Sequence, residues 1–171
     1  MALIFGGDVT KTWDSTATAQ SGDQAPHELG AVARVPRGDG NGDKWFVFVQ
    51  NSSGADIPVG TLCQWIAGTD SFRVEISAAT ASIAPAVLAG VAQVVIADGF
   101  QGWVQTWGRC ASLRNDGSGA WTAGAALASS GTVAGAVDVT AVTDTATVAI
   151  ARSTPLAGGV GAADLTISTG K

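Results

Sequence analysis

The sequence predicts a fold that is all or mainly β: a compact antiparallel β-barrel or sandwich with an extended N-terminal arm and very little helix. The acidic residues are nearly all Asp, and they lie with Gly where turns are expected, while Val, Thr and Trp fill the segments between. The 23 Gly and 5 Pro also indicate a turn-rich chain. Alanine favours helix, and the one segment where its frequency makes a helical turn plausible is residues 77–92. Pro85 interrupts this segment.

Individual strands follow from apolar and β-branched runs bounded by turn residues. Residues 44–50 form the densest such run, between turn signals at 39–43 and 51–54. Further strands are expected at residues 61–67, 72–76, 90–96, 101–107, 136–142 and 146–151. The short segments 68–71 and 97–100 are expected to close hairpins, because their Asp and Gly tolerate positive φ.

A weak internal repeat relates the middle of the chain to its C-terminal part. Residues 60–62 followed by 73–76 resemble residues 124–127 followed by 136–139 in the order of their glycine and β-forming residues. This pattern favours two related β halves.

The first residues lack the sustained β pattern of the rest of the chain. This difference predicts an N-terminal arm or extended segment over residues 1–28 and a β-rich domain over 29–171. The arm carries apolar residues that a solvated tail does not need. We therefore expect it to dock on a neighbouring molecule, and the alternative is packing onto its own domain. The candidate interface residues are Leu3, Ile4, Phe5 and Trp13.

Length, charge and apolar runs exclude several classes of protein. A chain of 171 residues predicts one domain, and a formal net charge of −5 with a pI near 4.5 disfavours nucleic acid as a partner. The start of the chain lacks a basic signal-peptide region, and the longest apolar stretch, 83–97, is interrupted and too short to span a membrane. Cys63 and Cys110 are expected to be buried free thiols.

Candidate catalytic and cofactor-binding residues are few, so the sequence predicts neither an enzyme nor a cofactor. The single histidine, His27, lies in an irregular stretch, and no nucleophile elbow accompanies it. The glycine-rich segment 158–161 lacks the rest of a phosphate-binding motif. Residues 39–43 match the start of a calcium loop, but Lys44 and Gln50 occupy the positions that need Gly and Glu, so a plain turn is favoured and no metal site is predicted. Residues 37–39 spell Arg-Gly-Asp, which a turn-rich chain readily contains by coincidence.

The order of segments from Pro26 to Ile150 resembles the head decoration, or capsid cement, proteins of tailed bacteriophages. The resemblance is carried by Leu29-Gly30, Val49-Gln-Asn51, Ser53-Gly54, Ile57-Pro-Val-Gly60-Thr-Leu62, Ala89-Gly-Val-Ala-Gln93, Ile96-Ala-Asp-Gly99, Gly102-Trp-Val-Gln-Thr-Trp-Gly108 and Gly124 with Leu127.

This resemblance implies a structural virion protein on the outer surface of an icosahedral capsid, made in the host cytoplasm. The implied partner is the major capsid protein of an HK97-type shell, and a homo-oligomer is expected, with a trimer favoured. Neither nucleic acid nor membrane is an implied partner. The alternative is a β-rich carbohydrate- or host-recognition module of a virion appendage, in which Trp65, Trp103 or Trp121 would be exposed to stack on sugar rings. Trp103 and Trp107 lie four residues apart, and at least one is expected in the core.

Overall fold

The fold was analysed in a computed structural model that describes residues 3–5, 8–14, 25, 27–36, 42–68, 72–81, 83–140, 147–155 and 159–167. These residues form strands and one short 3₁₀ helix, which confirms the all-β prediction. The elements in chain order are β1 (Leu3–Phe5), β2 (Trp13–Asp14), β3 (Val32–Val35), β4 (Lys44–Asn51), β5 (Leu62–Trp65), β6 (Arg73–Ile76), η1 (Pro85–Val87), β7 (Leu88–Ala92), β8 (Phe100–Arg114), β9 (Ala126–Ser129), β10 (Val137–Thr140), β11 (Ala149–Ala151) and β12 (Val160–Thr166). In this described part of the chain, no helix has the length and apolar character needed to cross a membrane.

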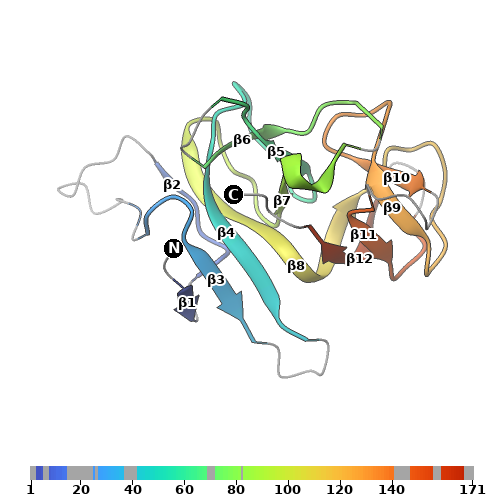
Figure 1. Cartoon of the computed structure of the whole chain (residues 1–171), viewed down its shortest axis with the longest axis horizontal. Helices are drawn as coiled ribbons and strands as arrows, with labels where there is room; N and C mark the ends of the chain where they lie inside the picture. The colour runs from blue at the N-terminus through green and yellow to red at the C-terminus, as the bar shows by residue number, and fades with distance from the viewer. Residues whose placement is uncertain are drawn as a thin grey trace.

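The first half of the fold is a closed barrel of the described strands β4, β6, β5, β7 and β8 (Figure 1). β4 pairs with β6 in parallel, the next three pairings are antiparallel, and β8 returns to pair with β4 and close the ring. Its interior is filled by aliphatic side chains with Trp65 and Cys63. The expected antiparallel pairing is confirmed for β5 with β6 and for β7 with β8. The second connection is longer than the predicted turn at 97–100, because β7 ends at Ala92, which pairs with Val104.

The second half repeats this arrangement with β8, β10, β9, β11 and β12. β8 pairs with β12, then β12 with β11, β11 with β9 and β9 with β10, all antiparallel. A parallel bridge between Asn115, just after β8, and Val137 of β10 closes the second barrel, as β4 and β6 close the first at Asn51 and Val74. The two barrels lie side by side and share the long strand β8 (Figure 1).

The correspondence extends to individual hydrogen bonds, which confirms the two related halves. In the first barrel the Gly60 amide donates to the Ala92 carbonyl at 2.8 Å, and the Ala92 amide donates to the Thr61 carbonyl at 3.1 Å. In the second barrel the Gly124 amide donates to the Ala151 carbonyl, and the Ala151 amide donates to the Ala125 carbonyl, both at 2.9 Å. Gly60 and Gly124 have φ values of 79° and 88°, a region in which a side chain is strained.

The same asparagine turn also follows the first strand of each barrel. The Asn51 side chain accepts from the Ser53 amide at 2.9 Å and donates to the Ala55 carbonyl at 2.8 Å. The Asn115 side chain accepts from the Gly117 amide and donates to the Gly119 carbonyl, both at 2.7 Å. Such side-chain bonds replace backbone pairing where a strand ends, so both turns start at the same point of their barrel.

A further core lies outside the first barrel, where the N-terminal residues cover β3, β4 and β8. β1 pairs with β3 in parallel, and β2 pairs with the start of β8. This core contains Trp13, Ala31, Ala33, Phe46, Phe48 and Trp103. β8 is therefore buried on both faces in this region, since Trp103 packs into the outer core and Val104 into the first barrel.

Several predicted strand bounds were wrong. β8 is about twice as long as the expected strand at 101–107, because the chain continues through Gly108 with positive φ to Arg114. β7 begins at Leu88 and ends at Ala92, and only a bridge from Ile96 to Ile57 remains of the expected C-terminal part of that strand. β3, β9 and β12 were not predicted. β9 and β12 consist largely of small residues that carry little β signal, and β3 has only four residues.

Candidate functional site

A β-bulge in the middle of β8 is the local feature from which the candidate site is built. Phe46 lies opposite Gln105 and Trp45 lies opposite Trp107, so Thr106 is an extra residue on β8. One extra residue reverses which side chains face the core. Trp103 is consequently fully buried while Trp107 is 52% exposed, although a regular strand would place residues four apart on the same face.

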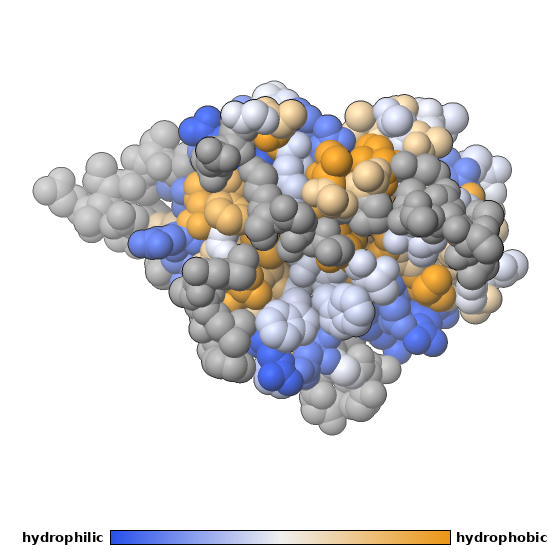
Figure 2. All heavy atoms as spheres, viewed as in Figure 1, coloured by the Kyte–Doolittle hydropathy of each residue, from blue (hydrophilic) through white to orange (hydrophobic). Residues whose placement is uncertain are grey.

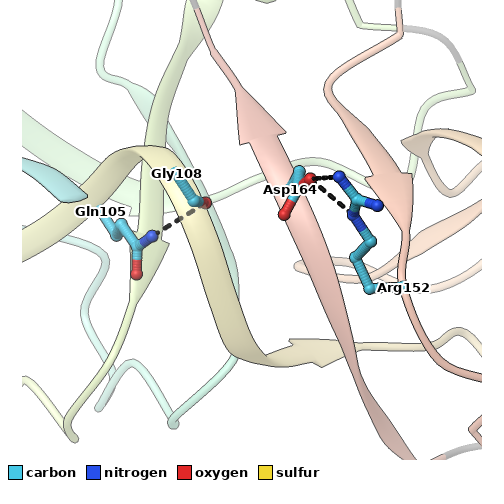
Figure 3. A network of polar contacts seen from close by, with 4 residues as sticks. All are labelled: Gln105, Gly108, Arg152 and Asp164. Atoms are coloured by element: carbon cyan, nitrogen blue, oxygen red, sulfur yellow. Dashed lines mark hydrogen bonds and ion pairs between the residues drawn. The ribbon is translucent and has the colours of Figure 1, made fainter. Parts of the chain in front are cut away.

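Two neighbours hold the bulge in place. Gly108 has a φ of 85°, and a Cβ there would lie 2.2 Å from the carbonyl oxygen of Asp43, so only glycine fits. The amide of Gln105, which is completely buried, donates to the carbonyl oxygens of Trp107 at 3.0 Å and of Gly108 at 3.1 Å. Figure 3 shows the Gln105 side chain reaching along β8 to Gly108. These contacts fix the backbone beneath the exposed Trp107 ring.

Trp107 borders an open groove of about 410 Å³, between the end of the β3–β4 hairpin and the strands β8, β11 and β12. This volume is in the range of pockets that take small ligands. The groove is lined by Gly42, Asp43, Trp107, Gly108, Arg109, Ile150, Arg152, Asp164, Leu165 and Thr166.

Ion pairs stand on two walls of the groove. Arg152 of the segment after β11 donates through Nε to Asp164 of β12 at 2.6 Å, and its terminal nitrogen contacts the same carboxylate oxygen (Figure 3). This hydrogen bond, together with the Asp164 charge, raises the pKa of Arg152 above its usual value. On the other wall Arg34 pairs with Asp43 and lies 5.8 Å from the ring centre of Trp45. Each pair is balanced in charge, and the lining also contains the guanidinium of Arg109.

The predicted interface residues of the arm have different outcomes. Trp13 is only 7% exposed and makes an edge-on contact with Phe48 at 5.5 Å between ring centres, so it packs onto its own domain. Leu3, Ile4 and Phe5 form β1 through their backbone, and their side chains lie outside the described residues. Their contact with a partner stays a prediction.

The prediction that Trp65, Trp103 or Trp121 is exposed to stack on sugar rings was wrong. Trp65 is 5% exposed, and Trp103 and Trp121 are completely buried. The dense β pattern around them indicated strands but did not distinguish the face toward solvent. Trp107 was missed for the same reason. The signal that could have found it is the Gln105 to Gly108 stretch, in which glycine interrupts a strand as bulges require.

His27 packs among aromatic rings, and the two cysteines lie in the barrel cores. The imidazole of His27 lies 5.3 Å from the Trp103 ring and 5.8 Å from the Phe48 ring, both edge-on. Cys63 and Cys110 are buried and free, as expected, and burial raises the pKa of both thiols. Among the described residues, no three His, Cys, Asp or Glu side chains gather as metal ligands would. The Arg-Gly-Asp triplet and most of the calcium-loop match lie outside the described residues.

The surface view in Figure 2 shows hydrophobic side chains in separate patches with hydrophilic ones between and around them, including a group at the lower edge of this face. Of the large hydrophobic residues exposed in the described part of the chain, Trp107 is the one aromatic residue. The others are Val59, Val87, Val95, Val139 and Val160.

Comparisons with known proteins give a distant structural likeness. No protein-family model matches the chain, and no curated protein matches it. Among solved structures, it is similar to the N base of the head fiber protein gp8.5 of bacteriophage phi29, with 12% sequence identity and a TM-score of 0.49. The match covers 72% of this chain and 97% of that chain. A likeness this distant does not assign a function.

Proposed function

We propose that this chain is a structural virion protein that binds the outer surface of an icosahedral phage capsid with an HK97-type shell and cements it. The proposal rests on the resemblance of its ordered segments to capsid decoration proteins. It requires no active site, cofactor, nucleic acid or membrane.

The observation that carries the proposal is that segments of the resemblance, which lie far apart in the sequence, contact one another in the fold. The Asn51 side chain donates to the Ile96 carbonyl at 2.8 Å, and the Gly54 amide donates to the Asp98 carboxylate at 3.0 Å. A Cβ on Gly90 would lie 2.9 Å from the Val104 side chain. Several of the matched segments therefore meet within the first barrel, which supports a likeness of fold over a chance likeness of composition.

A decoration protein acts through many copies, so modest contacts per copy are sufficient when several are engaged together. We propose a homo-oligomer, with a trimer favoured, because decoration at threefold positions of a shell would match that symmetry. Only 13% of the residues are charged, so few ionic side chains compete with such contacts.

The test is binding of the purified full-length protein to capsids assembled without it, with occupancy located by cryo-electron microscopy. The expected result is ordered density at repeated positions on the outer surface, with better survival of heated shells. An empty outer surface at low and physiological salt, or density inside the shell, would contradict the proposal.

The arm is tested by a shorter deletion than the whole segment, because Trp13 belongs to the core. A variant lacking residues 1–7 removes Leu3, Ile4 and Phe5 and keeps Trp13 in place. Lower occupancy with an unchanged melting temperature would support the arm as a capsid contact. Occupancy equal to that of the full-length protein would contradict it.

A further inference from the structure

The groove beside Trp107 has the features of a binding site that the proposed cementing role does not use. The Trp107 ring is half exposed, and in the described part of the chain no other ring or cation stacks on it. Trp45, its partner across the β4–β8 pairing, differs in having Arg34 over its ring. An exposed indole on a rigid strand offers a flat apolar platform, and a ligand that binds there has few side-chain rotamers to immobilise.

The rigidity of this platform comes from buried groups. Gln105 holds the carbonyls of Trp107 and Gly108, and Gly108 contacts the backbone at Asp43 so closely that no other residue fits. Bulges that re-aim a side chain in this way are common beside functional sites.

The polar groups around the platform limit the chemistry of the ligand. Arg152 contacts a single carboxylate oxygen of Asp164 through two nitrogens on one wall, and Asp43 is paired with Arg34 on the other. The lining also contains Arg109, which is engaged in an interaction of its own, and the net charge of the chain is negative, which disfavours polyanionic ligands. Paired guanidinium and carboxylate groups still carry unused donors and acceptors that suit vicinal hydroxyls.

We propose that this groove binds a neutral pyranose oligosaccharide, with the apolar face of one sugar ring on Trp107 and its hydroxyls toward Arg152, Asp164 and Thr166. The concave, ligand-sized shape favours a sugar over a protein surface, since a stable protein interface requires roughly 1,000 Å² or more. The site is independent of the capsid-binding proposal, and either can fail alone.

The test is a titration of the full-length protein with neutral tetrasaccharides of glucose, galactose, mannose and N-acetylglucosamine, followed by tryptophan fluorescence and by calorimetry. Polygalacturonate serves as the charged comparison. At least one neutral sugar is expected to bind saturably, with a blue shift of the emission, and polygalacturonate is expected to bind more weakly. Absence of saturable binding to all four sugars at millimolar concentration would overturn the proposal, as would stronger binding of polygalacturonate.

Substitutions of Trp107 and of a nearby exposed residue distinguish loss of the stacking surface from a general effect on the fold. Trp107→Ala is expected to weaken sugar binding by about tenfold or more, and Trp107→Phe by less, because an aromatic face remains. Val160→Ala is the matched control, since Val160 is 54% exposed on β12 but does not line the groove. Sugar affinity unchanged in Trp107→Ala would overturn the proposal.

The same variants distinguish a sugar site from a capsid contact. Trp107→Ala is expected to keep full occupancy on capsids. Loss of capsid binding in this variant, without any sugar binding by the wild-type protein, would overturn the sugar proposal and assign Trp107 to the shell interface.

Discussion

The two barrels share one scheme of strands, turns and hydrogen bonds, yet they fill the same positions with different side chains. Ile57 contacts Ile96 through a two-way backbone bridge at one end of the first barrel. At the corresponding place in the second barrel, Trp121 and Pro155 both pack on Gly161, and a Cβ there would lie 2.8 Å from the Trp121 ring and 3.0 Å from Pro155. The difference teaches that turn glycines, capping asparagines and backbone pairing define this barrel, whereas the identity of its core side chains can vary.

The largest expected effect is at the position where the two cores differ most. Trp121→Ala removes a completely buried indole and is expected to lower the free energy of unfolding by about 3–5 kcal/mol, because it leaves a large cavity. Ile57→Ala in the first barrel is expected to cost about 2–5 kcal/mol. Urea unfolding followed by circular dichroism measures both.

Because β8 belongs to both barrels, each of these variants is expected to unfold in a single transition. Two separated transitions in Trp121→Ala would show that the barrels unfold independently. A loss below about 1 kcal/mol would contradict the role of Trp121 as the centre of the second core.

The next effect compares the two turn glycines. Gly60→Ala and Gly124→Ala both force a side chain into positive φ, which costs about 1–2 kcal/mol. A Cβ on Gly60 would also lie 2.3 Å from the carbonyl oxygen of Ser112, whereas nothing lies within 4 Å of one on Gly124. Gly60→Ala is therefore expected to be the more destabilising by about 1–3 kcal/mol in thermal unfolding. Equal melting temperatures would contradict the crowded contact with β8.

A smaller difference is expected between the capping asparagines. Asn51 donates to two carbonyl groups, those of Ala55 and Ile96, while Asn115 donates to that of Gly119. Asn51→Ala removes one more donated hydrogen bond than Asn115→Ala does. Each substitution is expected to lower the free energy of unfolding by about 1–3 kcal/mol, with Asn51→Ala costing about 1 kcal/mol more than Asn115→Ala. Chemical unfolding of the two variants checks this, and the reverse order would contradict it.

Sequence reasoning reached the fold class, the strand at β4 and the relation between the halves because these depend on local patterns. Apolar and β-branched runs show strands directly, and the repeated glycine before each hairpin showed the duplication. That both barrels share β8 could not be predicted from such local patterns. Its continuation through Gly108 depends on the Gln105 amide and on a close approach to Asp43, which are contacts between distant parts of the chain.

The candidate site was missed for a related reason. The face of a strand that meets solvent follows from residue parity, and the extra Thr106 reverses that parity between Trp103 and Trp107. A bulge is defined by the partner strand, so it leaves only a weak trace in its own sequence. The arm was partly misinterpreted because Trp13 finds its partners, Phe48 and Trp103, far along the chain.

The smallest effect at neutral pH concerns the cysteines, of which each barrel core holds one. Burial raises the pKa of Cys63 from 9.0 to about 12, so the folded protein keeps this proton where the unfolded chain has released it. Between these two pH values the unfolded state binds fewer protons, and stability must fall as pH rises. The chain has no tyrosine to titrate in the same range.

Cys63→Ala is thus expected to flatten the fall in unfolding free energy between pH 8 and pH 10.5, measured by urea unfolding at steps of half a pH unit. Cys110→Ala is expected to flatten it less, because the Gln93 amide donates to the Cys110 sulfur at 3.2 Å and favours the thiolate. Identical slopes in the wild type and in Cys63→Ala would contradict a thiol protected by the first core. A steeper contribution from Cys110 would instead make the second barrel the better sealed of the two.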